Sequence, residues 1–366
     1  MLKPVHRVGC SPALAACQQL MKRFAIWLCQ PATSAMKVSE QGLQPPVLAT
    51  AIEANWLWSF LQRTEAGQTL LSRAQTLAGL PAVQKAALAA WVQAVGALPA
   101  YFQPGAGLWP VGRPLGSKQD WNAFKELMES FYVKGFADGL PYKADGIPTD
   151  AGGVTYADYV RAFRSVHRLN PDPNAREVCV LCGGHLGDTP HVDHWVTKRA
   201  FPLLSVCADN LLLICSTCNE APNKGKKPVH SGGSFSDWFH PYLRAGNAHV
   251  QLDYVLPAFA IQCSAAPADQ PKAANLDTLL NLSTRWTREF KAEYAKQQDV
   301  LNRRERRRLA LGQARHSLAE IQQHLQKWAA DLSLNEPHYE VHSVLGHALM
   351  HPARTQALLT ELSAVR

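Results

Sequence analysis

Four cysteines in two Cys-x-x-Cys pairs are the clearest chemical feature of this sequence. Cys179 and Cys182 form the first pair, and Cys215 and Cys218 form the second. Two such pairs supply the four thiolates of a tetrahedral zinc site. Two glycines directly after the first pair suit the tight turn in which such thiolates are held. The sequence therefore predicts one structural Zn²⁺ bound by these four cysteines.

A carboxylate and an imidazole stand between the two pairs. Asp193 and His194 are adjacent, within the strand-like run PHVDHWV (190–196). A neutral imidazole takes a proton from water near neutral pH, and a carboxylate is a hard ligand suited to Mg²⁺ or Mn²⁺. A hydrolytic site requires groups of these two kinds. The alternative is a capping carboxylate and a surface imidazole in a module that only binds nucleic acid or protein.

The order of these motifs resembles the HNH endonuclease family over about residues 176–230. The shared elements are Cys-x-x-Cys, Asp-His, Asn-Leu before apolar residues, Cys-x-x-Cys-Asn, and a Lys-rich stretch. The resemblance implies a small ββα-metal module that hydrolyses DNA phosphodiester bonds. The segment WVTKRAFPLLSVCADN, with its Phe-Pro and apolar residues, resembles HNH nucleases of prokaryotic anti-phage systems such as Septu and Zorya. That likeness implies a defence effector with other defence-system proteins as partners.

The resemblance also implies roles for single residues. His194 is expected to be the general base, and Asp193 to ligate a catalytic Mg²⁺ or Mn²⁺. Asn210 is expected to hold the loop in register through its amide. Asn219 is expected to be the second ligand of that cation and to begin the helix. Because a proline follows and delays helix formation, Asn223 is the alternative ligand.

The charge balance favours a polyanionic partner. The net charge is +8, which together with the motifs makes DNA the expected partner and RNA the alternative. Contacts to phosphate give affinity without sequence choice, so low sequence specificity is expected. The run RRERRR at 303–308 is equally compatible with a solvated helix face and with a binding surface. The expected phosphate-binding rim around the site consists of Lys198, Arg199, Lys224, Lys226 and Lys227.

The rest of the sequence predicts helices around this module. Apolar residues recur at helical spacing over 51–63 and 82–95, and segments rich in Pro and Gly interrupt the pattern. The expected fold is mostly α with a small central ββα-metal zinc module. The expected parts are a helical N-terminal domain (1–135), a linker with a lead-in helix (136–165), the HNH module (166–245), a connector (246–275) and a helical C-terminal domain (276–366).

Cysteine usage and hydropathy bear on the compartment. The chain has nine cysteines, and an odd total with two paired motifs favours a reducing compartment and a metal. No apolar run approaches the length of a membrane span. The first residues lack the continuous apolar region of a secretion signal. The sequence therefore predicts a cytoplasmic protein without a membrane span.

Overall fold

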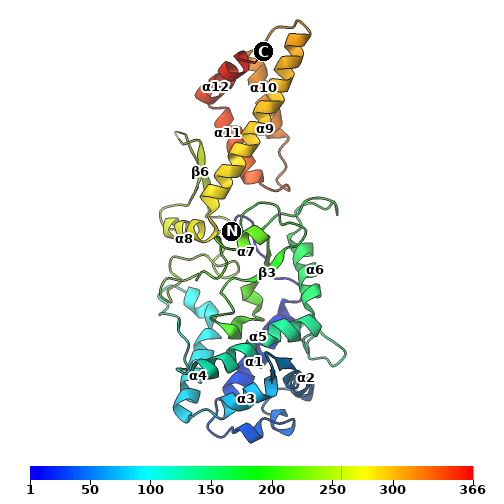
Figure 1. Cartoon of the computed structure of the whole chain (residues 1–366), viewed down its shortest axis with the longest axis vertical. Helices are drawn as coiled ribbons and strands as arrows, with labels where there is room; N and C mark the ends of the chain where they lie inside the picture. The colour runs from blue at the N-terminus through cyan, green and yellow to red at the C-terminus, as the bar shows by residue number, and fades with distance from the viewer. Residues whose placement is uncertain (257, 366) are drawn as a thin grey trace.

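We analysed a computed structural model of the chain, which describes residues 1–256 and 258–365. The molecule is elongated, with the N-terminal helices at one end and the C-terminal helices at the other (Figure 1). The prediction of a mostly helical protein is confirmed, since the strands of the described residues form only three two-stranded antiparallel sheets. None of the described helices has both the length and the apolar character needed to cross a bilayer.

The N-terminal end is a bundle of helices with apolar faces turned inward. On the first helix, Leu14, Cys17 and Phe24 recur at helical spacing and are fully buried. The helices predicted over 51–63 and 82–95 are present. The bundle consists of α1 (Ser11–Leu28), α2 (Ala51–Leu61), α3 (Leu70–Ala78), α4 (Ala82–Val95) and α5 (Lys118–Ser130), with the small hairpin β1 (Thr64–Glu65) and β2 (Gln68–Thr69) before α3.

A hairpin in the middle of the molecule carries the Asp-His pair. Strand β3 (His191–His194) pairs antiparallel with β4 (Leu211–Ile214), so that His194 lies opposite Leu211. Helix α6 (Tyr156–His167) contacts β4. Helix α7 (Ser216–Asn219) follows the hairpin and has only one turn. Asn219 therefore ends this helix, whereas the sequence suggested that it begins one.

The loop between β3 and β4 is anchored in the N-terminal bundle. Its short helical turn, Pro202–Leu204, contacts α1, α4 and α5. Phe201 stacks on Trp109 with ring centroids 3.9 Å apart. The Ser205 hydroxyl donates to the Met128 carbonyl at 2.8 Å. The apolar residues of this loop thus belong to the core of the protein, and the bundle fixes the position of the hairpin.

The C-terminal end begins with a hairpin that the sequence analysis placed in a connector. Strands β5 (Gln251–Val255) and β6 (Ala260–Ser264) pair within the stretch 246–275, and β6 packs on α9. In β6, Ile261 and Cys263 are buried while Gln262 between them is exposed, the alternation of a strand with one covered face. The helices that follow are α8 (Gln270–Leu280), α9 (Leu282–Ala310), α10 (Leu318–Ala330), α11 (Tyr339–Leu349) and α12 (Pro352–Ser363).

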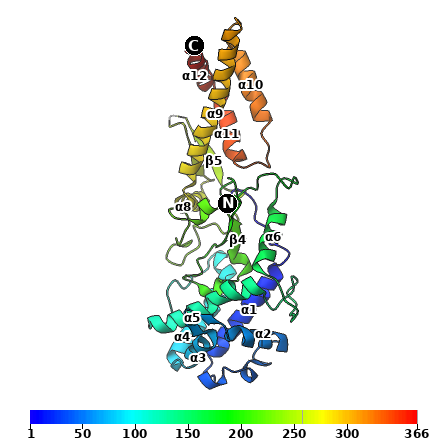
Figure 2. The same cartoon turned by 45° about the vertical axis from the view of Figure 1, so that its right-hand side comes forward.

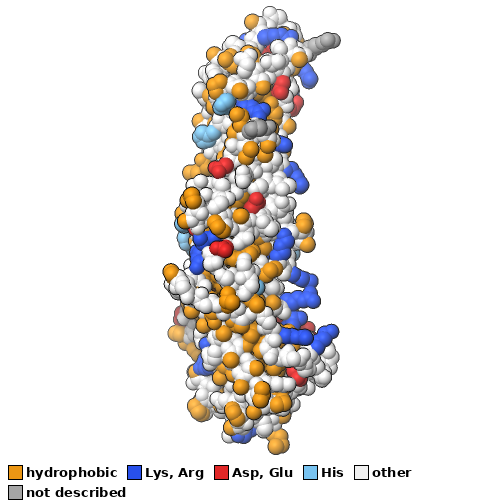
Figure 3. Space-filling view, turned by 90° about the vertical axis from the view of Figure 1, so that its left-hand side faces the viewer, with side chains coloured by type: hydrophobic (Ala, Val, Ile, Leu, Met, Phe, Trp, Pro, Cys, Tyr) orange, Lys and Arg blue, Asp and Glu red, His pale blue; other side chains and the backbone are white. Residues whose placement is uncertain are grey.

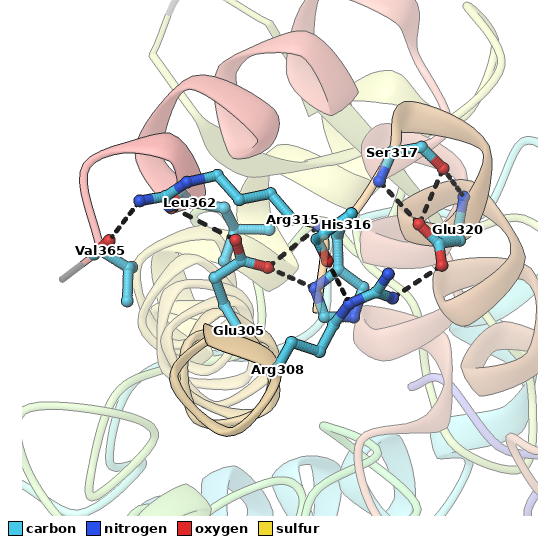
Figure 4. A network of polar contacts seen from close by, with 9 residues as sticks. Glu305, Arg308, Arg315, His316, Ser317, Glu320, Leu362 and Val365 are labelled. Atoms are coloured by element: carbon cyan, nitrogen blue, oxygen red, sulfur yellow. Dashed lines mark hydrogen bonds and ion pairs between the residues drawn. The ribbon is translucent and has the colours of Figure 1, made fainter. Parts of the chain in front are cut away.

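The arginine-rich run 303–308 lies inside α9 and takes part in an internal polar network (Figure 4). Glu305 is 1% exposed, 2.5 Å from His316 Nδ1, and accepts a hydrogen bond from Arg315 at 3.4 Å. Arg315 also donates to the Leu362 carbonyl at the end of α12. Arg308 forms an ion pair with Glu320 at 2.7 Å. One buried carboxylate therefore ties α9 to the chain before α10 and to the end of α12.

Candidate functional site

The four predicted zinc ligands come together in the structure. The Sγ atoms of Cys179, Cys182, Cys215 and Cys218 all lie within 4.8 Å of one another, and all four residues are buried. Two of the Sγ–Sγ distances are 4.0 Å and 3.9 Å. Tetrahedral Zn–S bonds of about 2.3 Å put sulfur atoms roughly 3.8 Å apart. The cluster therefore has the donors and the spacing of a zinc site.

Other parts of the chain converge on this cluster. Arg285 of α9 donates to Cys218 Sγ at 3.3 Å, and Trp286 donates to the Cys182 carbonyl at 3.0 Å. The His338 backbone N–H donates to the Gly183 carbonyl at 2.7 Å. Four thiolates around Zn²⁺ leave a net negative charge, which the Arg285 guanidinium partly offsets. Figures 1 and 2 both show the N-terminus at this level, where the Leu2 N–H donates to the Leu181 carbonyl.

His194 is buried and held in a defined orientation. Its Nε2 lies 2.9 Å from the Ser205 carbonyl oxygen, and its ring meets the Tyr132 ring edge to face at 4.6 Å. A carbonyl only accepts hydrogen bonds, so Nε2 carries the proton and Nδ1 carries the lone pair. Burial, helped by the Lys198 charge, lowers the pKa of His194 to about 3. The ring is therefore a neutral imidazole at physiological pH.

Asp193 lies on the other face of β3 and has a cation as its partner. Its Oδ2 is 2.8 Å from Lys224 Nζ, and the side chains of Asp193 and Lys224 are 9% and 1% exposed. Burial raises the pKa of Asp193, and the charge of Lys224 opposes that rise. Lys224 Nζ also donates to the His194 carbonyl at 2.7 Å. The two residues form a buried ion pair.

Asn210 connects the two ends of the loop between the strands. Its Oδ1 accepts the Val196 N–H at 2.7 Å, and its Nδ2 donates to the carbonyls of Val196 and Leu204 at 2.9 Å and 3.1 Å. The residue is fully buried. A single amide thus satisfies three buried backbone groups next to His194.

The two asparagines considered as cation ligands differ in environment. Asn219 is partly exposed at the end of α7. Asn223 is 7% exposed, and its Nδ2 donates to the Thr217 carbonyl at 2.6 Å. Asn223 Oδ1 is buried and has no hydrogen-bond partner among the described residues. Both asparagines offer an amide oxygen, and the choice between them stays a prediction.

The side chains around Asp193 do not fit a catalytic divalent cation in this arrangement. The only carboxylate proposed as a ligand is paired with an ammonium group at 2.8 Å. Among residues 1–256 and 258–365, the four cysteines are the only group of three or more His, Cys, Asp or Glu side chains close enough to share a metal.

The expected phosphate-binding rim is only partly exposed. Arg199 and Lys226 are exposed. Lys224 is an exception to the expectation, because the chain turns back after α7 and buries it against Asp193. Lys227 donates to the Thr278 carbonyl near the end of α8. Lys198 Nζ lies 4.0 Å above the Tyr132 ring, and burial lowers its pKa.

Sequence reasoning missed two neighbours of the site. Tyr132 comes from the π-helical turn Phe131–Phe136 after α5, and it contacts both His194 and Lys198. Glu129 lies near Lys198, and burial raises the pKa of Glu129. Both precede the cysteine module by a long stretch of chain, so no local motif could connect them with it. The apolar residues of the loop between β3 and β4 were the one signal in the sequence that another part of the protein covers this loop.

No protein-family model, curated protein or solved structure matches this chain.

Proposed function

We propose that this protein hydrolyses phosphodiester bonds of nucleic acid, with His194 as the general base. The observation that carries the proposal is the hydrogen bond between His194 Nε2 and the Ser205 carbonyl at 2.9 Å. This bond leaves Nδ1 as the atom that can accept a proton from water, and the same bond fixes the direction of its lone pair. In the described part of the chain, the hydrogen bond of the His194 ring to the protein is made through Nε2.

In the proposed step the chain supplies the base, and solvent supplies the nucleophilic water. The water gives its proton to Nδ1 as its oxygen attacks phosphorus, the bond from phosphorus to the leaving oxygen breaks, and the leaving oxygen takes a proton from solvent; the imidazolium then returns its proton to solvent. A phosphodiester near the ring raises the pKa of His194 by its negative charge, so the base strengthens when substrate is bound. The network of Asn210 and Ser205 keeps the imidazole in place during this step.

Nucleic acid is the substrate class that the charge supports. The net charge is +8, and Figure 3 shows Lys and Arg side chains gathered along one edge of the molecule while acidic side chains are scattered. Arg199 and Lys226 are the exposed cations of the expected phosphate-binding rim. DNA is the proposed substrate, and RNA is the alternative. The role in anti-phage defence, with other defence proteins as partners, stays a prediction from the HNH resemblance.

A catalytic Mg²⁺ or Mn²⁺ on Asp193 and Asn219 is part of what that resemblance implies. The ion pair between Asp193 and Lys224 argues against this catalytic cation, because the carboxylate already has an ammonium partner. The same ion pair favours a second candidate function, a zinc-stapled module that binds nucleic acid or protein without cleaving it. In that case Asp193 and His194 serve only the fold.

Cleavage assays separate the two functions. Purified zinc-loaded protein is incubated with supercoiled plasmid, single-stranded DNA and structured RNA, each in Mg²⁺ and in EDTA. The proposal predicts nicking or cutting of at least one substrate. Binding measured by fluorescence anisotropy, without cleavage of any substrate in either condition, would establish the second function in its place. The comparison of Mg²⁺ with EDTA shows directly whether a divalent cation takes part.

A further inference from the structure

Lys224 is placed where a cation would be expected to bind Asp193. Its ammonium group lies 2.8 Å from Asp193 Oδ2 and 2.7 Å from the His194 carbonyl oxygen. Carboxylate and backbone carbonyl oxygens are hard donors of the kind that Mg²⁺ and Ca²⁺ also select. The indole ring of Trp195 lies 6.0 Å from the same nitrogen. The ammonium therefore already has the oxygen neighbours that a metal ion would seek.

The Lys224 side chain belongs to a segment whose backbone is hydrogen-bonded to the chain at the cysteine cluster. The Lys224 N–H donates to the Cys218 carbonyl at 3.2 Å, and the Gly225 N–H donates to the Asn219 carbonyl at 3.1 Å. The Asn223 side chain donates to the Thr217 carbonyl. These bonds hold the returning chain against α7, which contains Cys218 of the four-cysteine cluster. The position of Lys224 is consequently set by the same structure that zinc stabilises.

Because Asp193 and Lys224 are both buried, each charge needs the other as its partner. A competing ion has little room beside them. Lys224 is 1% exposed and Asp193 is 8% exposed. An unpaired carboxylate at this depth is strongly unfavourable, so one cation must stay beside it. A divalent ion on the same carboxylate would lie next to the Lys224 ammonium, and the two like charges would repel each other in a poorly solvated site. Either the ammonium or the metal ion can be bound, but not both.

We propose that Lys224 is the built-in cation of this module and excludes divalent metal ions from Asp193. Asp193 is accordingly a positioning residue: it holds Lys224, which in turn binds the carbonyl of the residue that carries the imidazole. Where this inference touches catalysis it rests on the proposed function, because it implies that cleavage by His194 needs no metal ion on Asp193. The prediction that Lys224 excludes divalent metal ions from Asp193 does not depend on whether the protein cleaves nucleic acid.

Manganese binding tests the proposal without an activity assay. Free Mn²⁺ is measured by its paramagnetic resonance signal during titration of the zinc-loaded full-length protein up to millimolar concentration. The variants are Lys224→Met, the matched surface control Lys226→Met, Asp193→Asn, and the neutral pair Asp193→Asn/Lys224→Met. Zinc content, measured on each sample, reports whether the module is folded.

The proposal predicts that the parent, Lys226→Met and Asp193→Asn bind Mn²⁺ equally weakly. Lys224→Met is expected to gain one site of at least tenfold higher affinity, and the neutral pair is expected to lose it. A Mn²⁺ site in the parent that Asp193→Asn abolishes overturns the proposal, as does a folded Lys224→Met protein without the gain. If Lys224→Met loses its zinc, the parent is compared with the neutral pair: equal binding supports the proposal, and tighter binding by the parent overturns it.

The cleavage assay distinguishes this inference from the proposed function. A parent that cleaves nothing but shows the expected Mn²⁺ pattern removes the nuclease and leaves the Lys224 assignment intact. A parent that cleaves only with Mg²⁺, and binds Mn²⁺ through Asp193, removes the Lys224 assignment and leaves the nuclease.

Discussion

Asn210 is the residue on which the geometry around His194 depends most. Replacing Asn210 with Ala removes the partners of two buried backbone groups, the N–H and the carbonyl of Val196, and one of the two donors to the Leu204 carbonyl, which keeps the Cys207 N–H. Each such group costs about 1–3 kcal/mol, and partial relaxation brings the expected total loss to roughly 3 kcal/mol. Denaturant unfolding measures it. Asn219→Ala, at a partly exposed position, is the control, expected to stay within about 0.5 kcal/mol. Equal losses in both variants would contradict the role of Asn210.

The buried state of His194 predicts an unusual pH dependence of cleavage. The base form is present above the pKa, which burial lowers to about 3 in the free protein. The value of kcat/KM reports groups of the free enzyme. It is therefore expected to stay level as the pH falls from 8 to 5.5. An acidic limb centred near pH 6.5, the ordinary value of a solvated histidine, would mean that the imidazole which acts is not buried in this way.

The roles of some residues can be predicted from the sequence, and the roles of others cannot. The four cysteines were predictable, because two fixed spacings and one metal geometry determine them. Lys224 was not, because a run of lysines normally indicates solvent exposure. Its burial results from the chain turning back onto α7, where the Lys224 N–H binds the Cys218 carbonyl. That contact depends on tertiary structure and leaves no local signature.

Among the elements, α9 carries a carboxylate that supports the whole C-terminal end. Glu305→Gln removes the buried carboxylate charge that faces Arg315 and His316, while the Arg315 side chain itself is 44% exposed. Because solvent screens the exposed partner, a loss of about 1–2 kcal/mol is expected for the C-terminal helices. Thermal unfolding followed by circular dichroism checks it. Arg306→Gln, on the exposed side of the same helix turn, is the matched control and is expected to change little. If the two variants melt alike, the network in Figure 4 does not stabilise this end.

Elements with strong periodicity were predictable, and short ones were not. The helices at 51–63 and 82–95 were found as α2 and α4, because each buries a regular apolar stripe. The sequence indicated a connector where the β5–β6 hairpin lies, although Ile261 and Cys263 alternate with the polar residues Gln262 and Ser264. Flanking prolines and alanines hid this short pattern. Likewise, the run 303–308 could not be divided by sequence into arginines that pair internally and arginines that face solvent.

The four-cysteine cluster, the predicted zinc site, joins parts of the chain that are distant in sequence. The cluster contacts the first residues through Leu181, α9 through Arg285 and Trp286, and the start of α11 through His338. Because the binding free energy of a structural zinc is largely folding free energy, chelation is expected to release all of these contacts together. The helices of the N-terminal bundle also pack on one another, α1 on α4 and α3 on α5, and are expected to remain folded.

Hydrogen exchange after zinc removal measures this coupling. The amides near His338 and those of β3 and β4 are expected to exchange at least tenfold faster than in the zinc-loaded protein. The amides of α1 and α4 are expected to keep their exchange rates. The control is the same protein with zinc restored. Unchanged protection near His338 in zinc-free protein would show that the C-terminal end is held by its own packing alone.

If His194 is the general base, its removal must slow the cleavage step, and a comparison of single-turnover rates measures this effect. Single-turnover cleavage of the same nucleic acid is measured for the parent, for His194→Ala and for His185→Ala, an exposed histidine of the same module, in samples of equal zinc content. Loss of a general base lowers the rate by about 10²–10⁴-fold. We expect this loss for His194→Ala alone, with binding of the nucleic acid retained. A His194→Ala protein that is folded, zinc-loaded and as active as the parent would contradict it.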